Sequence, residues 1–294
     1  MSNNWLIQPL FDWAGWAYLL ATIGAIAAAA FIPSSKSTKT ASVILVLGLS
    51  SVLPLQVYLG YRGSMAEGAQ REAQLKRAMG IYADRCKSAG VRVYSRPERV
   101  NALMLEQLRP DVNRYDQYAL DDPYGSDFPG EAYAMSFLWA RAEWPRLDET
   151  ATAGARFAYV VYRSATDKNV LLQMTPTSER NTNGTVRFSV NPTNIVPKYT
   201  LRFIDMSTKA DRDHWIAGSK LQLIESESGS VVAEREGWMI DVGQGDRSGE
   251  RQPWTYAAAT ACPPFPKLHE TYPYRRGQAR RFVDQVFSES EEKK

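Results

Sequence analysis

The stretch ASVILVLGLSSVLPLQVYLGY, residues 41–61, contains no charged side chain and is long enough to cross the apolar core of a bilayer as a helix. A second uncharged stretch, residues 13–35, precedes it and predicts another span over about 13–33. The connector Pro33–Thr40 is short, so we expect an antiparallel transmembrane hairpin over residues 1–62. Pro54 lies inside the second span, where a proline is tolerated.

A cleaved signal peptide is the competing interpretation of the first stretch, because Ala27–Ala30 resembles a small-residue cleavage site. No Lys or Arg precedes the apolar run, and Asp12 lies where a basic segment belongs, which favours a retained span. Lys36 and Lys39 indicate a cytoplasmic connector, with both termini and the following domain outside. Basic residues soon after the second span point the other way, but large domains translocate largely regardless of their charge.

The charge balance changes once the hairpin is set aside. The 294 residues have a net charge of +3, and residues 1–62 hold three basic side chains and one acidic side chain. Residues 63–294 are therefore nearly neutral. Because nucleic-acid binding depends largely on neutralising phosphates, this balance excludes nucleic acid as the expected partner and leaves the lipid bilayer and another protein.

Residues 63–90 predict a helical stalk. Leu75, Met79, Tyr82 and Cys86 fall at helical spacing and form one apolar stripe. Gly90 is expected to end the helix. The stripe is too short for a convincing dimer seam, so we expect it to pack on the chain's own domain.

The rest of the chain has the period of β-strands. Residues 220–225 and 231–236 flank a turn that contains Gly229, which predicts a hairpin. We expect seven or eight strands and one further helix at about 276–288. The predicted fold is a membrane-anchored α+β protein: an N-terminal two-helix transmembrane hairpin, a helical stalk, and a mainly antiparallel β domain over residues 91–288 with a C-terminal helix. Residues 289–294 form a charged tail, and barrel and sandwich arrangements both remain open.

The two cysteines, Cys86 and Cys262, lie near opposite ends of the globular region. In an oxidising compartment such a pair is expected to form a disulfide. Two unrelated buried thiols are the alternative. No CxxC motif and no Cys/His spacing occurs, which argues against a zinc site or a redox dithiol.

Signals for catalysis are weak. The chain has two histidines, His214 and His269, and lacks GxSxG and HExxH motifs. The glycines of residues 243–249 resemble a phosphate loop, but their spacing is wrong and no βαβ unit surrounds them. We therefore predict no catalytic residue, no metal and no cofactor.

One acidic, tyrosine-rich segment at residues 115–131 is the candidate binding site. It contains Tyr115, Asp116, Tyr118, Asp121, Asp122, Tyr124, Asp127 and Glu131. An ordered loop in which Asp and Pro form turns is the simplest interpretation. A protein-contact surface comes next, because tyrosines supply contact area at low entropic cost. Calcium binding and paired hydrolytic carboxylates are further alternatives.

Residues 121–125 and 214–218 resemble stretches of uncharacterised proteobacterial membrane proteins, a resemblance that names no family and assigns no residue a role. We expect an inner-membrane protein whose periplasmic domain binds a protein partner without catalysis. It would act as an inhibitor or immunity protein, or as an accessory subunit of an envelope complex. The alternative is a membrane-tethered, carboxylate-dependent envelope hydrolase that uses residues 116–131.

Overall fold

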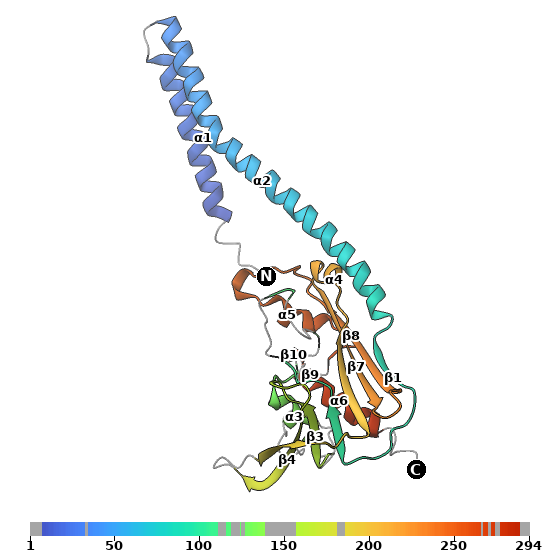
Figure 1. The fold of residues 1–294 in the computed structure, drawn as a ribbon. Helices are drawn as coiled ribbons and strands as arrows, with labels where there is room; N and C mark the ends of the chain where they lie inside the picture. The colour runs from blue at the N-terminus through green and yellow to red at the C-terminus, as the bar shows by residue number, and fades with distance from the viewer. Residues whose placement is uncertain are drawn as a thin grey trace. The chain divides into compact units, whose positions relative to one another are not determined.

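The computed structural model describes residues 8–32, 35–110, 116–118, 124, 127–138, 157–180, 186–265, 267–269, 272–273 and 277–288 (Figure 1). The chain divides into two compact units, Met1–Glu72 and Ala73–Lys294. Helix α2, Lys36–Cys86, begins in the first unit and ends in the second. The candidate binding residues Tyr115, Asp121 and Asp122 lie outside the described residues.

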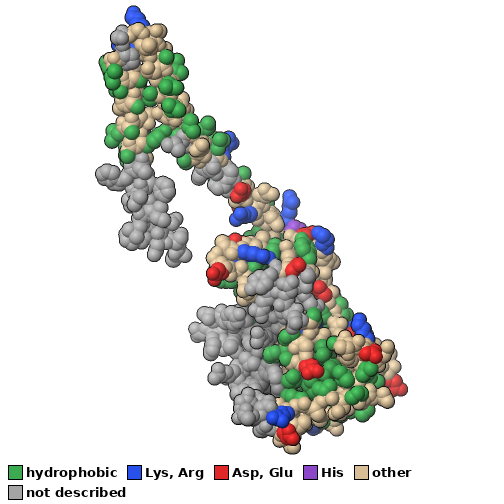
Figure 2. Space-filling view, turned by 60° about the vertical axis from the view of Figure 1, so that its left-hand side comes forward, with side chains coloured by type: hydrophobic (Ala, Val, Ile, Leu, Met, Phe, Trp, Pro, Cys, Tyr) green, Lys and Arg blue, Asp and Glu red, His purple; other side chains and the backbone are tan. Residues whose placement is uncertain are grey.

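The first unit contains α1 (Gln8–Phe31) and the first part of α2. The two helices touch where the Tyr18 hydroxyl donates to the backbone oxygen of Ser50. Hydrophobic side chains, green in Figure 2, lie on the surface of the helical part of the first unit, and Val57 is 71% exposed. In the described part of the chain, one helix segment, Lys36–Leu59, is long and apolar enough to cross a membrane, whereas the apolar helix Gly15–Phe31 is shorter.

The second unit is built on an eight-stranded sheet, as the β-strand periodicity predicts. Its strands in chain order are β1 (Gly90–Val93), β2 (Ala102–Leu105), β3 (Tyr159–Arg163), β4 (Leu171–Arg180), β5 (Val186–Thr193), β6 (Tyr199–Asp205), β7 (Ile216–Glu225) and β8 (Val231–Ile240). The spatial order is β1-β8-β7-β6-β2-β3-β4-β5. Every neighbouring pair is antiparallel except β2 with β3 and β2 with β6.

The strands form one open sheet, which is neither the barrel nor the sandwich that the sequence allowed. Within the described residues, the edge strands β1 and β5 each pair on one side only. A separate small sheet joins β9 (Lys267–His269) to β10 (Tyr272–Pro273). The mainly antiparallel α+β architecture is confirmed.

One face of the sheet packs against two helices, α3 (Glu131–Leu138) and α6 (Gln278–Ser288). Leu103, Tyr162 and Leu223 point from the strands into this core, where they meet Phe137 and Phe282. The C-terminal helix agrees with the predicted range. The short helices α4 (Lys209–Asp213), α5 (Pro253–Tyr256), η2 (Ser248–Glu250) and η3 (Ala257–Thr260) were not predicted, and neither was α3.

The end of α2 packs on the sheet, as expected for the apolar stripe, but through a different set of side chains. Ala78 is fully buried, whereas Met79 is 41% exposed. The prediction that Met79 belongs to the buried stripe is therefore wrong. The contact face passes through Ala78, Ile81 and Tyr82, and the small alanine allows the helix to lie close to the strands. Helix α2 ends at Cys86, and Gly90 opens β1 with φ of +136°.

Candidate functional site

The end of α2 is fastened to β7 and β8 by an apolar contact, which we call the joint. Ala78 packs with Ile216, Trp238 and Ile240, all of them buried. Gly218 makes room for the indole ring, because a Cβ atom there would lie 2.3 Å from a Trp238 ring carbon. The glycine and the tryptophan pair across the two strands. The Trp238 ring therefore lies over Gly218 and packs against Ala78 of α2.

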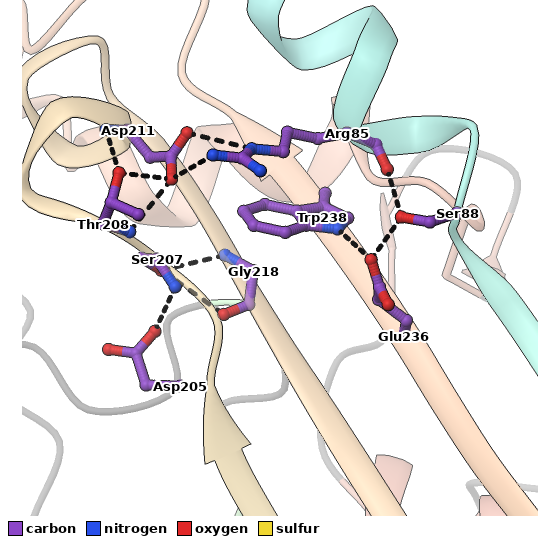
Figure 3. A network of polar contacts seen from close by, with 9 residues as sticks. All are labelled: Arg85, Ser88, Asp205, Ser207, Thr208, Asp211, Gly218, Glu236 and Trp238. Atoms are coloured by element: carbon purple, nitrogen blue, oxygen red, sulfur yellow. Dashed lines mark hydrogen bonds and ion pairs between the residues drawn. The ribbon is translucent and has the colours of Figure 1, made fainter.

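A polar network surrounds this contact (Figure 3). The Arg85 guanidinium donates to both carboxylate oxygens of Asp211, at 3.2 and 3.1 Å. It also lies 5.0 Å from the ring centre of Trp238. Asp211 is buried and accepts from the backbone N–H of Thr208 at 2.9 Å, which closes a capping box at the start of α4. The helix end is thus ion-paired to a preorganised carboxylate.

The disulfide completes the joint and confirms the pairing expected from the sequence. Cys86 and Cys262 are bonded, with their Cα atoms 5.8 Å apart. Cys262 exchanges two backbone hydrogen bonds with Trp238, of 2.8 and 2.7 Å. The Tyr82 hydroxyl donates to the backbone oxygen of Thr260, and burial, with a smaller contribution from Tyr124, raises the pKa of Tyr82 to about 12. These contacts hold the end of α2, which contains Tyr82 and Cys86, against the segment that contains Thr260 and Cys262.

A pair of carboxylates that the sequence reasoning missed lies on β8 beside the joint. Glu234 and Glu236 are both buried, and the Lys220 ammonium lies 3.7 and 3.3 Å from them. Burial by itself raises the pKa of Glu236, but hydrogen bonds from Ser88, Trp238 and Lys220 outweigh burial and hold this pKa below its usual value. Such a carboxyl is ionised near neutral pH and is a poor general acid. The alternation of acidic and basic residues at 234–236 is the sequence feature that could have pointed to this pair.

The first part of the acidic, tyrosine-rich segment lies against α4. The Asp116 carboxylate accepts from the backbone N–H of Tyr118 at 2.8 Å, as in a turn. The Tyr118 hydroxyl donates to Asp213, and the Lys209 ammonium lies 3.1 Å from the same carboxylate. Tyr118 is 54% exposed, and Asp116 and Glu131 are also exposed.

The remaining described residues of the segment hold the fold together. Tyr124 is buried, and its hydroxyl donates to the Pro263 backbone oxygen at 3.1 Å. The buried Asp127 carboxylate accepts from the N–H of Ala279 in the first turn of α6, at 3.1 Å. Glu131 accepts from the Tyr162 hydroxyl at 3.2 Å. The described carboxylates of this segment therefore have separate structural partners in different parts of the domain.

The glycine-rich loop after β8 surrounds a carboxylate of the chain itself. Asp241 is fully buried and accepts from the backbone N–H groups of Gly243 and Gly245, at 3.1 and 2.9 Å. The Arg251 guanidinium lies on the same carboxylate. His214 follows α4 as its C-terminal cap. In the part of the chain that the structure describes, no cluster of three His, Cys, Asp or Glu side chains is placed to hold a metal ion.

The end of the sheet opposite the joint has two adjoining grooves. Residues 194–198, the crossover segment, lead from β5 to β6, although β4, β3 and β2 lie between these strands. A groove of about 310 Å³ separates this segment from residues 99–102 and Tyr159. Another, of about 520 Å³, separates it from the β7–β8 turn at residues 225–227. The side chains of Ile195 and Val196, which both line the first groove, are 50% and 58% exposed.

The crossover segment is anchored at both ends. The backbone N–H of Ile195 donates to the Thr193 hydroxyl at 3.1 Å, and the backbone oxygen of Lys198 accepts from the N–H of Ser226 at 2.8 Å. Pro197 is buried. The two exposed apolar side chains are thus presented on a fixed backbone.

Comparison with known proteins gives no relative: no protein-family model matches the chain, and no curated protein or solved structure is significantly similar to it.

Proposed function

We propose that this chain is an inner-membrane protein, anchored by the helices of its first unit, whose β-rich domain lies outside the cytoplasm and binds a protein partner. The observation that carries the proposal is the Cys86–Cys262 disulfide, which joins the last turn of α2 to the segment after η3. Disulfides persist in oxidising compartments such as the periplasm and are rare in the cytosol.

Exposed apolar surface supports the membrane anchor. The side chains of Trp16, Leu20 and Phe31 on α1 and of Leu49 and Val57 on α2 are largely exposed. Soluble monomers rarely expose contiguous apolar patches beyond a few hundred Å². A bilayer supplies the missing apolar surroundings, and the apolar segment of α2 has the length that this requires. In the proposal, α1 is the first span of the hairpin and the apolar segment of α2 is the second.

The role in binding rests on how the polar groups of the domain are used. The described carboxylates that a hydrolase would need, among them Asp127 and Glu131, bind backbone and side-chain groups of the fold. The crossover segment instead presents apolar side chains to solvent on a fixed backbone. An inhibitor, an immunity protein or an accessory subunit of an envelope complex would use such a surface.

Thiol labelling tests the topology. Ser35→Cys places a thiol in the connector, and Ser228→Cys places one in the exposed β7–β8 turn. The native cysteines are joined and do not react with a thiol reagent. In intact spheroplasts, a membrane-impermeant reagent should label Ser228→Cys, and it should label Ser35→Cys only after lysis. The reverse pattern would place the domain in the cytoplasm and refute the proposal.

A further inference from the structure

We infer that the surface formed by the crossover segment and its two grooves is the partner-binding site, and that it takes a protein segment with an apolar side chain beside a basic one. This inference rests on the proposed function, because it assumes that the domain binds a protein. It assigns the site to residues 99–102, 194–198 and 225–227, and not to the acidic segment at residues 115–131.

The apolar part of the inference comes from the first groove. It is lined by Val100, Ala102, Tyr159, Ile195 and Val196, and also by the polar residues Arg99 and Asn101. Buried apolar contacts at the centre of an interface, shielded by a polar rim, contribute most of its binding energy. An apolar side chain of the partner in this groove would bury the exposed parts of Ile195 and Val196.

The basic part comes from the second groove. Lys198 is its cation, and that ammonium already lies 2.8 Å from Glu98 and 3.9 Å from Glu225. Glu227 contributes a further carboxylate to the lining of the groove. The two lining carboxylates, Glu225 and Glu227, outnumber the one lining ammonium and leave this groove negative, although Arg99 lies on the neighbouring one. A lysine or arginine of the partner would meet complementary charge there.

Fixed geometry favours binding at this place. The anchored ends of the crossover segment and the buried Pro197 mean that little backbone freedom is lost when a partner docks. Preorganisation of this kind raises affinity by lowering the entropic cost of association.

Photo-crosslinking of the full chain in its native membrane locates the site. A photoreactive phenylalanine analogue replaces Val196 in one strain and Val242 in another. Val242 is a matched control, because it is 48% exposed and follows the joint end of β8. We expect one discrete adduct at Val196 whose added mass differs from that of this chain, and none at Val242.

The outcomes separate the inference from the proposed function. An adduct at Val242 alone would refute this surface while leaving partner binding in place. An adduct at Val196 with the mass of two copies of the chain would show that this surface binds a second copy, and would refute the inference that the partner is a different protein. The absence of adducts at both positions would count against the inference and the proposed function together.

Affinity measurements with the crosslinked protein, once identified and purified, test the chemistry. Val196→Asp should weaken binding at least tenfold, and Val242→Asp should leave it unchanged. Glu227→Gln should weaken binding less than Glu227→Lys, and added salt should weaken the wild-type complex. Equal affinity of the wild type and Glu227→Lys would refute the basic contact. Retention of the Cys86–Cys262 disulfide in each variant, read from its mobility on a non-reducing gel, shows that the fold is intact.

Discussion

Removal of the Cys86–Cys262 disulfide should weaken the second unit without unfolding it. The two cysteines are separated by 176 positions in the sequence. For a closed loop of that length, the chain-entropy relation gives about 5 kcal/mol at 25 °C as an upper value, and native disulfides usually contribute about 2–4 kcal/mol. The apolar contacts of Ala78 and the ion pair between Arg85 and Asp211 remain, so we expect the double variant Cys86→Ala/Cys262→Ala to stay folded.

Urea unfolding of the full chain in detergent, followed by tryptophan fluorescence, measures this loss. With a slope of about 2–3 kcal/mol per molar urea, the midpoint should fall by about 1 M. Each single variant, Cys86→Ala and Cys262→Ala, removes the same crosslink. The two single variants and the double variant should therefore lose equal stability, because the effect belongs to the bond and not to either side chain.

Two results would refute this reasoning. Single-variant losses that add up in the double variant would show that the cysteines act through packing, since independent contributions add and a shared bond does not. A double variant with wild-type stability would show that the polar network and the apolar contact at the joint are sufficient to hold the end of α2.

Two further predictions concern the same strands. Gly218→Ala would place a Cβ atom 2.3 Å from the Trp238 ring and should cost about 1–3 kcal/mol of unfolding free energy. Gly80→Ala, in an open part of α2, is the control and should stabilise the helix by about 0.5–1 kcal/mol. Equal urea midpoints for the two variants would contradict the close contact between Gly218 and Trp238. The pKa of Glu236 is lower in the folded state than in the unfolded chain, so its ionised form stabilises the protein above about pH 5, and this stability is lost as the pH falls through the folded pKa. Glu236→Gln should flatten the fall of the urea midpoint as the pH drops below about 5, and an unchanged pH profile would contradict the assignment.

The elements that the sequence predicts correctly are those with a strong local pattern. The β7–β8 hairpin follows from alternating residues on both sides of a turn with Gly229, whose φ is +70°. Helix α6 follows from its amphipathic pattern, and the disulfide follows from there being only two cysteines. The sheet order does not follow from such patterns. β2 is only four residues long and lies between β3 and β6, and distant segments select these neighbours.

The candidate binding residues show the limit of composition as a guide to function. Asp127 and Tyr124 belong to a conspicuous acidic and aromatic segment, yet one caps α6 and the other lies buried over β8. Their partners, Ala279 and Gly237, lie more than one hundred residues away, so the sequence gives no signal of these roles. Ile195 and Val196 attract little attention in the sequence, because their exposure results from a crossover that only the sheet order reveals.

The pairing of β1 with β8 has a consequence for the order in which the chain folds. Val93 pairs with Ala233. β1, the first strand of the sheet to be synthesised, therefore stays unpaired until β8, the last strand, has been made. Contacts between such distant residues form slowly, because a long loop must close before they contribute. The β7–β8 hairpin is local and is available as a template well before β1 can dock on it. We therefore expect the stalk end of α2 and β1 to be added last, with a newly made chain exposing the edge of β8 until nearly all of the domain has emerged.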